Sequence, residues 1–231
     1  MNRQDAGSLW LRWVGANSLA EAVGLGLTFA LDVLIIWQVA QAGSAWASLV
    51  SILLMSATGA IEGGVVGWLQ WLVLRRPFPQ LARRAWIRAT IIGAVVAWFL
   101  GSLPSTLMDM GAAETDTAVA EPSLTTVLLL AAGMGLVLGL VLAFPQWRVL
   151  RTAVDHAWVW LPANAAAWAV GMAMIFFLID LAQRSSSTAV IILTILAGLF
   201  LTGAVVGAVH GLALVWLARP APVRLSDALW R

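Results

Sequence analysis

The chain has 231 residues, of which 61% are hydrophobic and only 10% charged, and its mean hydropathy is +0.92. So little polar surface excludes a soluble globule of this size and indicates an integral membrane protein. A formal net charge of +2 excludes the electrostatic footprint of a nucleic-acid-binding protein, and the lack of cysteine excludes disulfides, thiolate metal sites and a cysteine nucleophile.

Six stretches are apolar enough to cross a bilayer core of about 30 Å, which takes about 20 helical residues each. They cover residues 17–39, 47–74, 85–107, 124–147, 158–180 and 189–217. The start of the chain has no short apolar region followed by a small-residue cleavage site, so we expect no removable signal peptide. Several tryptophans fall near the predicted span ends and are interpreted as anchors at the membrane surface: Trp10, Trp13, Trp46, Trp86, Trp158, Trp160 and Trp216.

The basic residues, all of them arginine, divide unevenly between the two sides of the predicted spans. Only Arg184 falls on one side, while the other side carries Arg3, Arg12, Arg75, Arg76, Arg83, Arg84, Arg88, Arg148, Arg151, Arg219, Arg224 and Arg231. Positive charge stays inside, so both termini are predicted to be cytoplasmic, in a bacterial inner membrane. The acids of the one charged outer connection, a solvated loop or a collector for cations, are Asp109, Glu114, Asp116 and Glu121.

The first span carries a polar face. Asn17, Glu21, Thr28 and Asp32 follow one another at intervals of four, seven and four residues, which places them within about 60° of one another around a helix. An ionised acid near the bilayer centre costs about 2.5–3.5 kcal/mol. No arginine lies inside the predicted core to neutralise these acids. They are therefore either protonated and act as hydrogen-bonding glue between helices, or they line a cavity that admits a cation or proton.

The second span combines polar and small residues. Glu62 and Gln70 lie within about 60° of a stripe formed by Gly59, Gly63 and Gly67, so both should face neighbouring helices rather than lipid. Small residues at this spacing let helix backbones approach closely. The same stripe recurs in the fourth and sixth spans as Gly135, Gly139, Gly203, Gly207 and Gly211. Close packing within the chain is the preferred interpretation, with dimerisation of whole molecules as the alternative.

These even-numbered spans are repeats of one another. "GGVVGWLQWLVLR" (63–75) aligns without gaps on "GLVLAFPQWRVLR" (139–151), which pairs Gln70 with Gln146. A third copy, "GAVVGAVHGLALVWL" (203–217), has His210 at that position.

The odd-numbered spans repeat as well. "WVGANSLAEAVGLGLTFAL" (13–31) aligns on "WLPANAAAWAVGMAMIFFL" (160–178), and the third span fits more loosely, with Thr90 at the asparagine position. We therefore predict an all-α membrane protein, one transmembrane domain over 1–231, built as a pseudo-threefold bundle of three parallel two-helix repeats. The repeats cover about 10–78, 83–154 and 157–219, followed by a tail, 220–231.

The pattern G-x-x-x-G-x-x-Q-W-x-V-L-R, together with "ANSLAEAVGLGL", resembles a family of uncharacterised bacterial multi-pass membrane proteins that carry this repeat. The resemblance covers most of the chain and implies no activity. The three-repeat organisation is similar to that of mitochondrial carriers, but their P-x-[DE]-x-x-[KR] signature is absent, so the likeness is one of architecture.

The acids break the repeat pattern. Glu62 corresponds to Leu138 and Thr202, whereas Gln70, Gln146 and His210 keep a polar side chain in every copy. The symmetric positions are interpreted as scaffold, and the asymmetric acids as the place to look for function.

His210 raises one alternative, since a membrane histidine can bind haem or a chlorophyll-type pigment. The preferred interpretation is a hydrogen-bonding substitute for glutamine, with no cofactor and no metal. No nucleotide-binding, hydrolase or zinc-protease motif occurs, so an enzyme is not expected.

The first functional hypothesis is a small carrier or permeation protein whose cavity is built mainly by the first two spans. Its cation- or proton-binding residues would be Glu62, Asp32 and Glu21, with Gln70, Asn17 and His210 completing the set. The second hypothesis is a structural or accessory subunit of a larger membrane complex, associated with lipid or pigment. Expected partners are membrane lipids, another membrane protein or further copies of the chain, and no nucleic acid.

Overall fold

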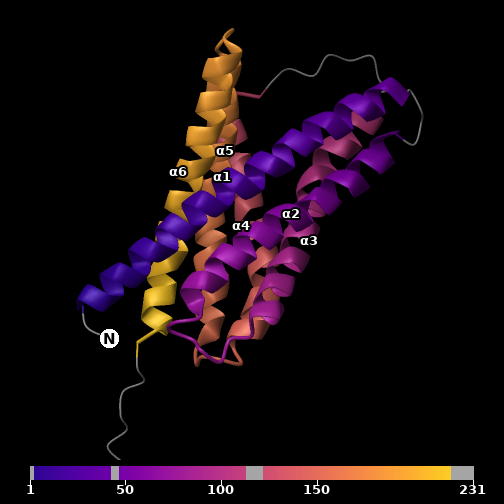
Figure 1. Ribbon diagram of the computed structural model, residues 1–231. Coiled ribbons are helices and arrows are strands. Elements are labelled where there is room, and N and C mark those ends of the chain that lie inside the picture. Colours follow the sequence, from indigo (N-terminus) through magenta and orange to yellow (C-terminus); the bar gives the residue numbers. More distant parts are fainter. Residues whose placement is uncertain (1–2, 43–46, 113–121, 220–231) are drawn as a thin grey trace, which may run out of the picture.

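The computed structural model describes residues 3–42, 47–112 and 122–219, and these residues form six long helices and one short 3₁₀ turn (Figure 1). The elements are α1 (Arg3–Ala42), α2 (Ala47–Leu74), α3 (Arg83–Ala112), α4 (Leu124–Leu150), η1 (Ala157–Val159), α5 (Trp160–Gln183) and α6 (Thr188–Leu217). Each of the six helices is long and apolar enough to cross a membrane. The prediction of six apolar spans in an all-helical protein is therefore confirmed for the described residues.

The helix bounds differ from the predicted spans mainly at α1, which begins at Arg3 rather than near residue 17. The added segment is polar at its start but contains no proline that would end the helix. A helix that continues past the hydrocarbon core also keeps its backbone hydrogen bonds. Pro104 and Pro145 lie inside α3 and α4. The outer-loop acids Glu114, Asp116 and Glu121, the side chain of Asp109 and the tail 220–231 lie outside the described residues.

The helices close into a ring. Each packs against its neighbours in the chain, and α6 packs back against α1. The α2–α3 and α4–α5 connections lie at the same end as the start of α1 (Figure 1). We call this the arginine-rich end, because Arg75, Arg76, Arg83 and Arg151 lie in or beside those connections. Toward the opposite end, α1, α2 and α3 lean away from α4, α5 and α6.

The bundle exposes large apolar side chains and buries a set of polar ones, which is unlike a soluble protein. Large aliphatic residues such as Leu53, Leu129 and Leu193 are more than 60% exposed, while Asn17 and Gln146 are buried. In lipid, apolar surface needs no cover, and polar side chains must find partners within the protein. The distribution therefore suits a ring of helices surrounded by acyl chains.

A buried apolar cluster, here called the plug, closes the ring at the arginine-rich end. It comprises Leu9, Trp13, Leu74, Phe78, Leu81, Trp86, Ala143, Leu150, Ala157, Trp160, Leu214 and Leu217. The indoles of Trp13 and Trp86 each meet Trp160 edge to face, with ring centroids 5.9 and 6.1 Å apart.

These three indoles were expected to be surface anchors, and that interpretation is wrong for them. Trp13, Trp86 and Trp160 are each 0% exposed, so they cannot reach lipid headgroups. Trp158 and Trp216, at 59% and 44% exposed, are free to do so. Trp46 lies outside the described residues.

The glycine stripes lie between neighbouring helices of the ring. The stripe of α2 faces α3, that of α4 faces α5, and that of α6 faces α1. A Cβ added to Gly63, Gly139 or Gly203 would lie 2.5–2.7 Å from a backbone atom of the facing helix. Glycine at these positions is what allows the backbones to approach so closely. A Cβ added to Gly135 would collide with the backbone of Trp168. A Cβ added to one of the remaining stripe glycines would also crowd the facing helix, at a somewhat longer distance or against a side chain: Gly59, Gly67, Gly207 and Gly211.

Candidate functional site

A belt of hydrogen-bonded side chains crosses the ring just above the plug. We call it the polar belt, and its members are Trp13, Asn17, Gln70, Thr90, Gln146, Trp160, Asn164 and His210. Gln70 donates to Asn17 Oδ1 (2.9 Å), and Gln146 donates to Thr90 Oγ1 (3.0 Å) and Gln70 Oε1 (3.4 Å). The belt therefore links α1, α2, α3 and α4 through side chains alone.

Two indoles continue the belt to the remaining helices. Trp160 Nε1 donates to Gln146 Oε1 (2.9 Å), and Trp13 Nε1 donates to His210 Nδ1 (2.8 Å). Because Nδ1 accepts a hydrogen bond, the imidazole carries its proton on Nε2 and is neutral in this arrangement. His210 is 1% exposed, with ring centroids of Trp13 and Trp160 at 5.5 and 5.3 Å.

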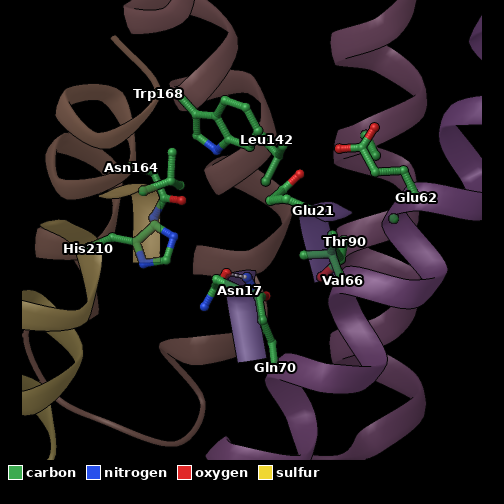
Figure 2. Close-up of a pocket in the computed structure, with 13 residues that line it drawn as sticks. Asn17, Glu21, Glu62, Val66, Gln70, Thr90, Leu142, Asn164, Trp168 and His210 are labelled. Atoms are coloured by element: carbon green, nitrogen blue, oxygen red, sulfur yellow. Dashed lines mark hydrogen bonds between the residues drawn. The ribbon is translucent and has the colours of Figure 1, made fainter. Parts of the chain in front are cut away.

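Above the belt lies a small polar cavity, here called the chamber, of about 10 Å³. That volume holds about one water molecule. All six helices contribute to its wall, which is lined by Asn17, Glu21, Glu62, Gly63, Val66, Gln70, Thr90, Ala94, Leu142, Asn164, Trp168, Val206 and His210. Figure 2 shows Glu21 and Glu62 with their carboxyl groups turned toward the space between them, and Asn17 and Gln70 below.

A larger cavity, here called the vestibule, continues from the chamber away from the arginine-rich end. Its volume is about 280 Å³, and α1, α2, α3, α4 and α5 line it. It shares Glu62, Ala94, Leu142 and Trp168 with the chamber, so these side chains form the boundary between the two. At the far side the wall includes Ser105 and Ile179, which are exposed, so the vestibule reaches the surface of the bundle.

Glu62 stands at this boundary because of two neighbouring residues. A Cβ added to Gly24 would lie 3.3 Å from Glu62 Cα, so α1 and α2 approach closely here. On the other side, Trp98 of α3 donates its indole N–H to Glu62 Oε2 and stacks edge to face on Phe29. The carboxyl group is thereby held between the two cavities, and Glu62 is 4% exposed.

The other two acids of the predicted set occupy different places. Glu21 is 2% exposed and lines the chamber, and its Oε2 has no hydrogen-bond partner. Asp32 is buried between α1 and α2, where Thr58 donates to its Oδ1 at 2.8 Å. Asp32 lines neither cavity. The structure thus brings Glu21 and Glu62 together at the chamber and leaves Asp32 out of the wall of either cavity.

The acids have no basic partner. All arginines in the described part of the chain are exposed, and the ion pair found there is Arg184 with Asp180, 2.7 Å apart at the outside of α5. An ionised carboxylate within a span costs several kcal/mol unless it is compensated. Glu21 and Glu62 are therefore poised to hold either a proton or a cation from outside the chain.

Of the predicted site residues, five line the chamber: Asn17, Glu21, Glu62, Gln70 and His210. The expectation that the first two spans build most of the cavity is too narrow, since all six helices contribute. Trp98 was not singled out from the sequence. Its position could have drawn attention to it, because Trp98 lies in the middle of a predicted span and so cannot anchor the helix at the membrane surface.

Within the described residues, no group of three or more histidine, aspartate and glutamate side chains could hold a metal ion. Comparison with family models, curated proteins and solved structures finds no match for this chain.

Proposed function

We propose that this protein is a small membrane carrier or permeation protein that binds a cation or proton at Glu62 and Glu21. The observation that carries the proposal is the order of features along the axis of the ring: an accessible vestibule, two buried carboxyl groups, the polar belt and the plug. A binding site reached from one side and closed on the other is the geometry of one state of an alternating-access carrier.

The repeat organisation is part of the proposal. The glycine stripe of each even-numbered helix faces the odd-numbered helix that follows it around the ring. A tryptophan near the start of an odd-numbered helix donates a hydrogen bond to the repeated polar residue of the even-numbered helix that packs against it in two places. Trp13 of α1 donates to His210 of α6, and Trp160 of α5 donates to Gln146 of α4. Trp86 is the exception, because its indole N–H has no partner. These relations favour three parallel repeats around one axis. The proposed placement in a bacterial inner membrane, with both termini in the cytoplasm, is supported by the distribution of arginine.

The second hypothesis, a structural or accessory subunit, draws less support. A subunit that assembles through small-residue stripes needs a stripe on its outer surface. The predicted glycine stripes are instead occupied by α3, α5 and α1 of the same chain.

The test is flux into liposomes that contain the purified protein and a pH-sensitive dye, after an inward proton gradient or an inside-negative potential is imposed. The parent protein should acidify the lumen faster than empty liposomes do. Glu62→Gln and Glu21→Gln should abolish the excess rate, since an amide can exchange neither a proton nor a cation. Asp180→Asn, which changes an acid at the surface, should leave the rate unchanged.

Asp32→Asn separates the structural from the sequence-based expectation. The sequence alone predicts that it abolishes flux, as Glu62→Gln does. Because Asp32 lines neither cavity, we expect this variant to retain flux. Parent protein without proton flux above that of empty liposomes, under either gradient, would refute a proton carrier.

A further inference from the structure

The vestibule is an apolar cavity with one acid at its inner end. Among the described residues that line it, Glu62 is the one titratable side chain, and most of the others are aliphatic or aromatic, such as Leu25, Leu138 and Ile175. At about 280 Å³ it approaches the size of small-molecule sites, which begin at about 300 Å³. The space is therefore large for a bare ion and suited to a small organic molecule.

Four aromatic side chains line the same space: Phe29, Trp98, Trp168 and Phe176. Aromatic faces attract organic cations, and the attraction is stronger where water is excluded. Among them, Trp98 is also hydrogen-bonded to Glu62. An ionisable carboxyl group and aromatic surface thus lie side by side at the inner end of the vestibule.

A metal ion would find too few ligands here. Magnesium and calcium take six or more oxygen ligands, several of them from carboxylates or carbonyls. The vestibule offers one carboxyl group, one of whose oxygens already accepts from Trp98, and the hydroxyls of Ser102 and Ser105. A single charge next to apolar walls complements a ligand with one positive charge and an apolar body.

We infer that the vestibule binds an amphiphilic organic monocation, an alkyl- or arylammonium, with its charged group at Glu62 and its apolar part among Phe29, Leu138 and Ile175. This inference rests on the proposed function and names its substrate class. A second observation supports it. On the chamber side of the same boundary, the buried Oε2 of Glu21 has no hydrogen-bond partner.

Binding of the organic cation is coupled to the release of a proton from Glu62. In the empty site the cheapest state of Glu62 within the membrane is the protonated one, because no cation of the chain reaches it. When the organic cation arrives, Glu62 gives up one proton to solution and the ion pair keeps the site neutral. Two titratable groups of the other helices line the chamber with Glu62, namely Glu21 of α1 and His210 of α6. Asp32 of α1 lies outside the chamber but close enough to interact electrostatically with Glu62.

The experiment is calorimetric titration of the purified protein in detergent with benzyltrimethylammonium, in two buffers of different ionisation enthalpy. We expect saturable binding to one site and release of about one proton per ligand, since a single carboxyl group ionises when the cation binds. Glu62→Gln should weaken binding at least about tenfold. The matched control Asp180→Asn should bind as the parent does. Neopentylbenzene, the uncharged carbon analogue of the probe, should bind at least about tenfold more weakly than the cation.

A second variant covers the case in which Glu62→Gln fails to fold. Ala97→Phe places a ring in the vestibule without changing any acid, because Ala97 lines that space. It should weaken binding of the cation at least about tenfold, since the volume is then filled. Equal binding of the neutral analogue, or full binding by Glu62→Gln or Ala97→Phe, would overturn the inference.

The inference and the proposed function fail separately. Glu62-dependent proton flux without saturable binding of the ammonium probe would overturn the inference and leave the carrier intact. Binding that requires Glu62, with no flux of protons or of the probe in liposomes, would support the ligand class and overturn the carrier.

Discussion

His210 shows how one side chain can hold the end of a helix ring together. Its Nδ1 accepts from Trp13, on the helix at the other end of the sequence, and its ring packs against Trp160. In the same way, the amide oxygen of Gln146 accepts a hydrogen bond from Trp160. A histidine and a glutamine can therefore serve the same purpose, because each offers an acceptor at similar reach.

Two substitutions at His210 test this equivalence. His210→Gln should keep the acceptor for Trp13 and change the free energy of unfolding by less than about 1 kcal/mol. His210→Leu leaves a buried indole N–H without a partner and should cost about 1–2 kcal/mol. Unfolding in detergent, followed by tryptophan fluorescence, measures both. Equal losses for the two variants would show that packing, rather than the hydrogen bond, is what His210 provides.

At the scale of the helix pair, the approach of two backbones decides where the polar side chains point. α4 lies against α5 through Gly135 and Gly139, and a Cβ on Gly139 would lie 2.6 Å from Asn164 O and 2.9 Å from Ala165 Cα. The facing atoms belong to backbone and cannot rotate away. The glycines thus set the distance between helices at which Gln146 can accept from Trp160.

The same helix provides a matched pair of glycine substitutions. Gly139→Ala forces α4 from α5 and should lower the free energy of unfolding by about 1–3 kcal/mol, as overpacking does in protein cores. Gly133→Ala should be neutral or slightly stabilising, because nothing lies within 4 Å of its added Cβ. Thermal unfolding of the two variants in the same detergent makes the comparison. If Gly133→Ala were as harmful as Gly139→Ala, close packing could not explain the stripe.

For the whole molecule, the distribution of arginine predicts the orientation in the membrane. The α2–α3 and α4–α5 connections carry arginines, while the short α5–α6 connection has Arg184, which is paired with Asp180. Positive charge is retained on the cytoplasmic side during insertion. The vestibule should therefore open away from the cytoplasm in this state.

Cysteine labelling checks the orientation directly, because the chain has no cysteine of its own. Ser186→Cys, exposed in the α5–α6 connection, should react with a membrane-impermeant maleimide on intact cells. Thr152→Cys, exposed after α4, should react only after the membrane is permeabilised. The opposite pattern would mean that the vestibule faces the cytoplasm.

The six spans, the polar face of α1 and the glycine stripes could be predicted from the sequence, because hydropathy and helical period are local properties of a segment. The membership of Glu21, Glu62, Gln70 and Asn17 in one polar region was predictable for the same reason. A helix with acids on one face must turn that face away from lipid, whichever neighbours it has.

The tertiary structure alone decided which residues meet across the ring. The contact of Trp98 with Glu62, the bond from Trp13 to His210, the burial of Trp13 in the plug and the separation of Asp32 from both cavities depend on how each helix is rotated and which helix lies beside it. Lipid is as apolar as a leucine side chain, so hydropathy does not rank one neighbour above another. Rotation and neighbours are set by packing between residues far apart in the sequence, and the vestibule exists because that packing is close at one end and open at the other.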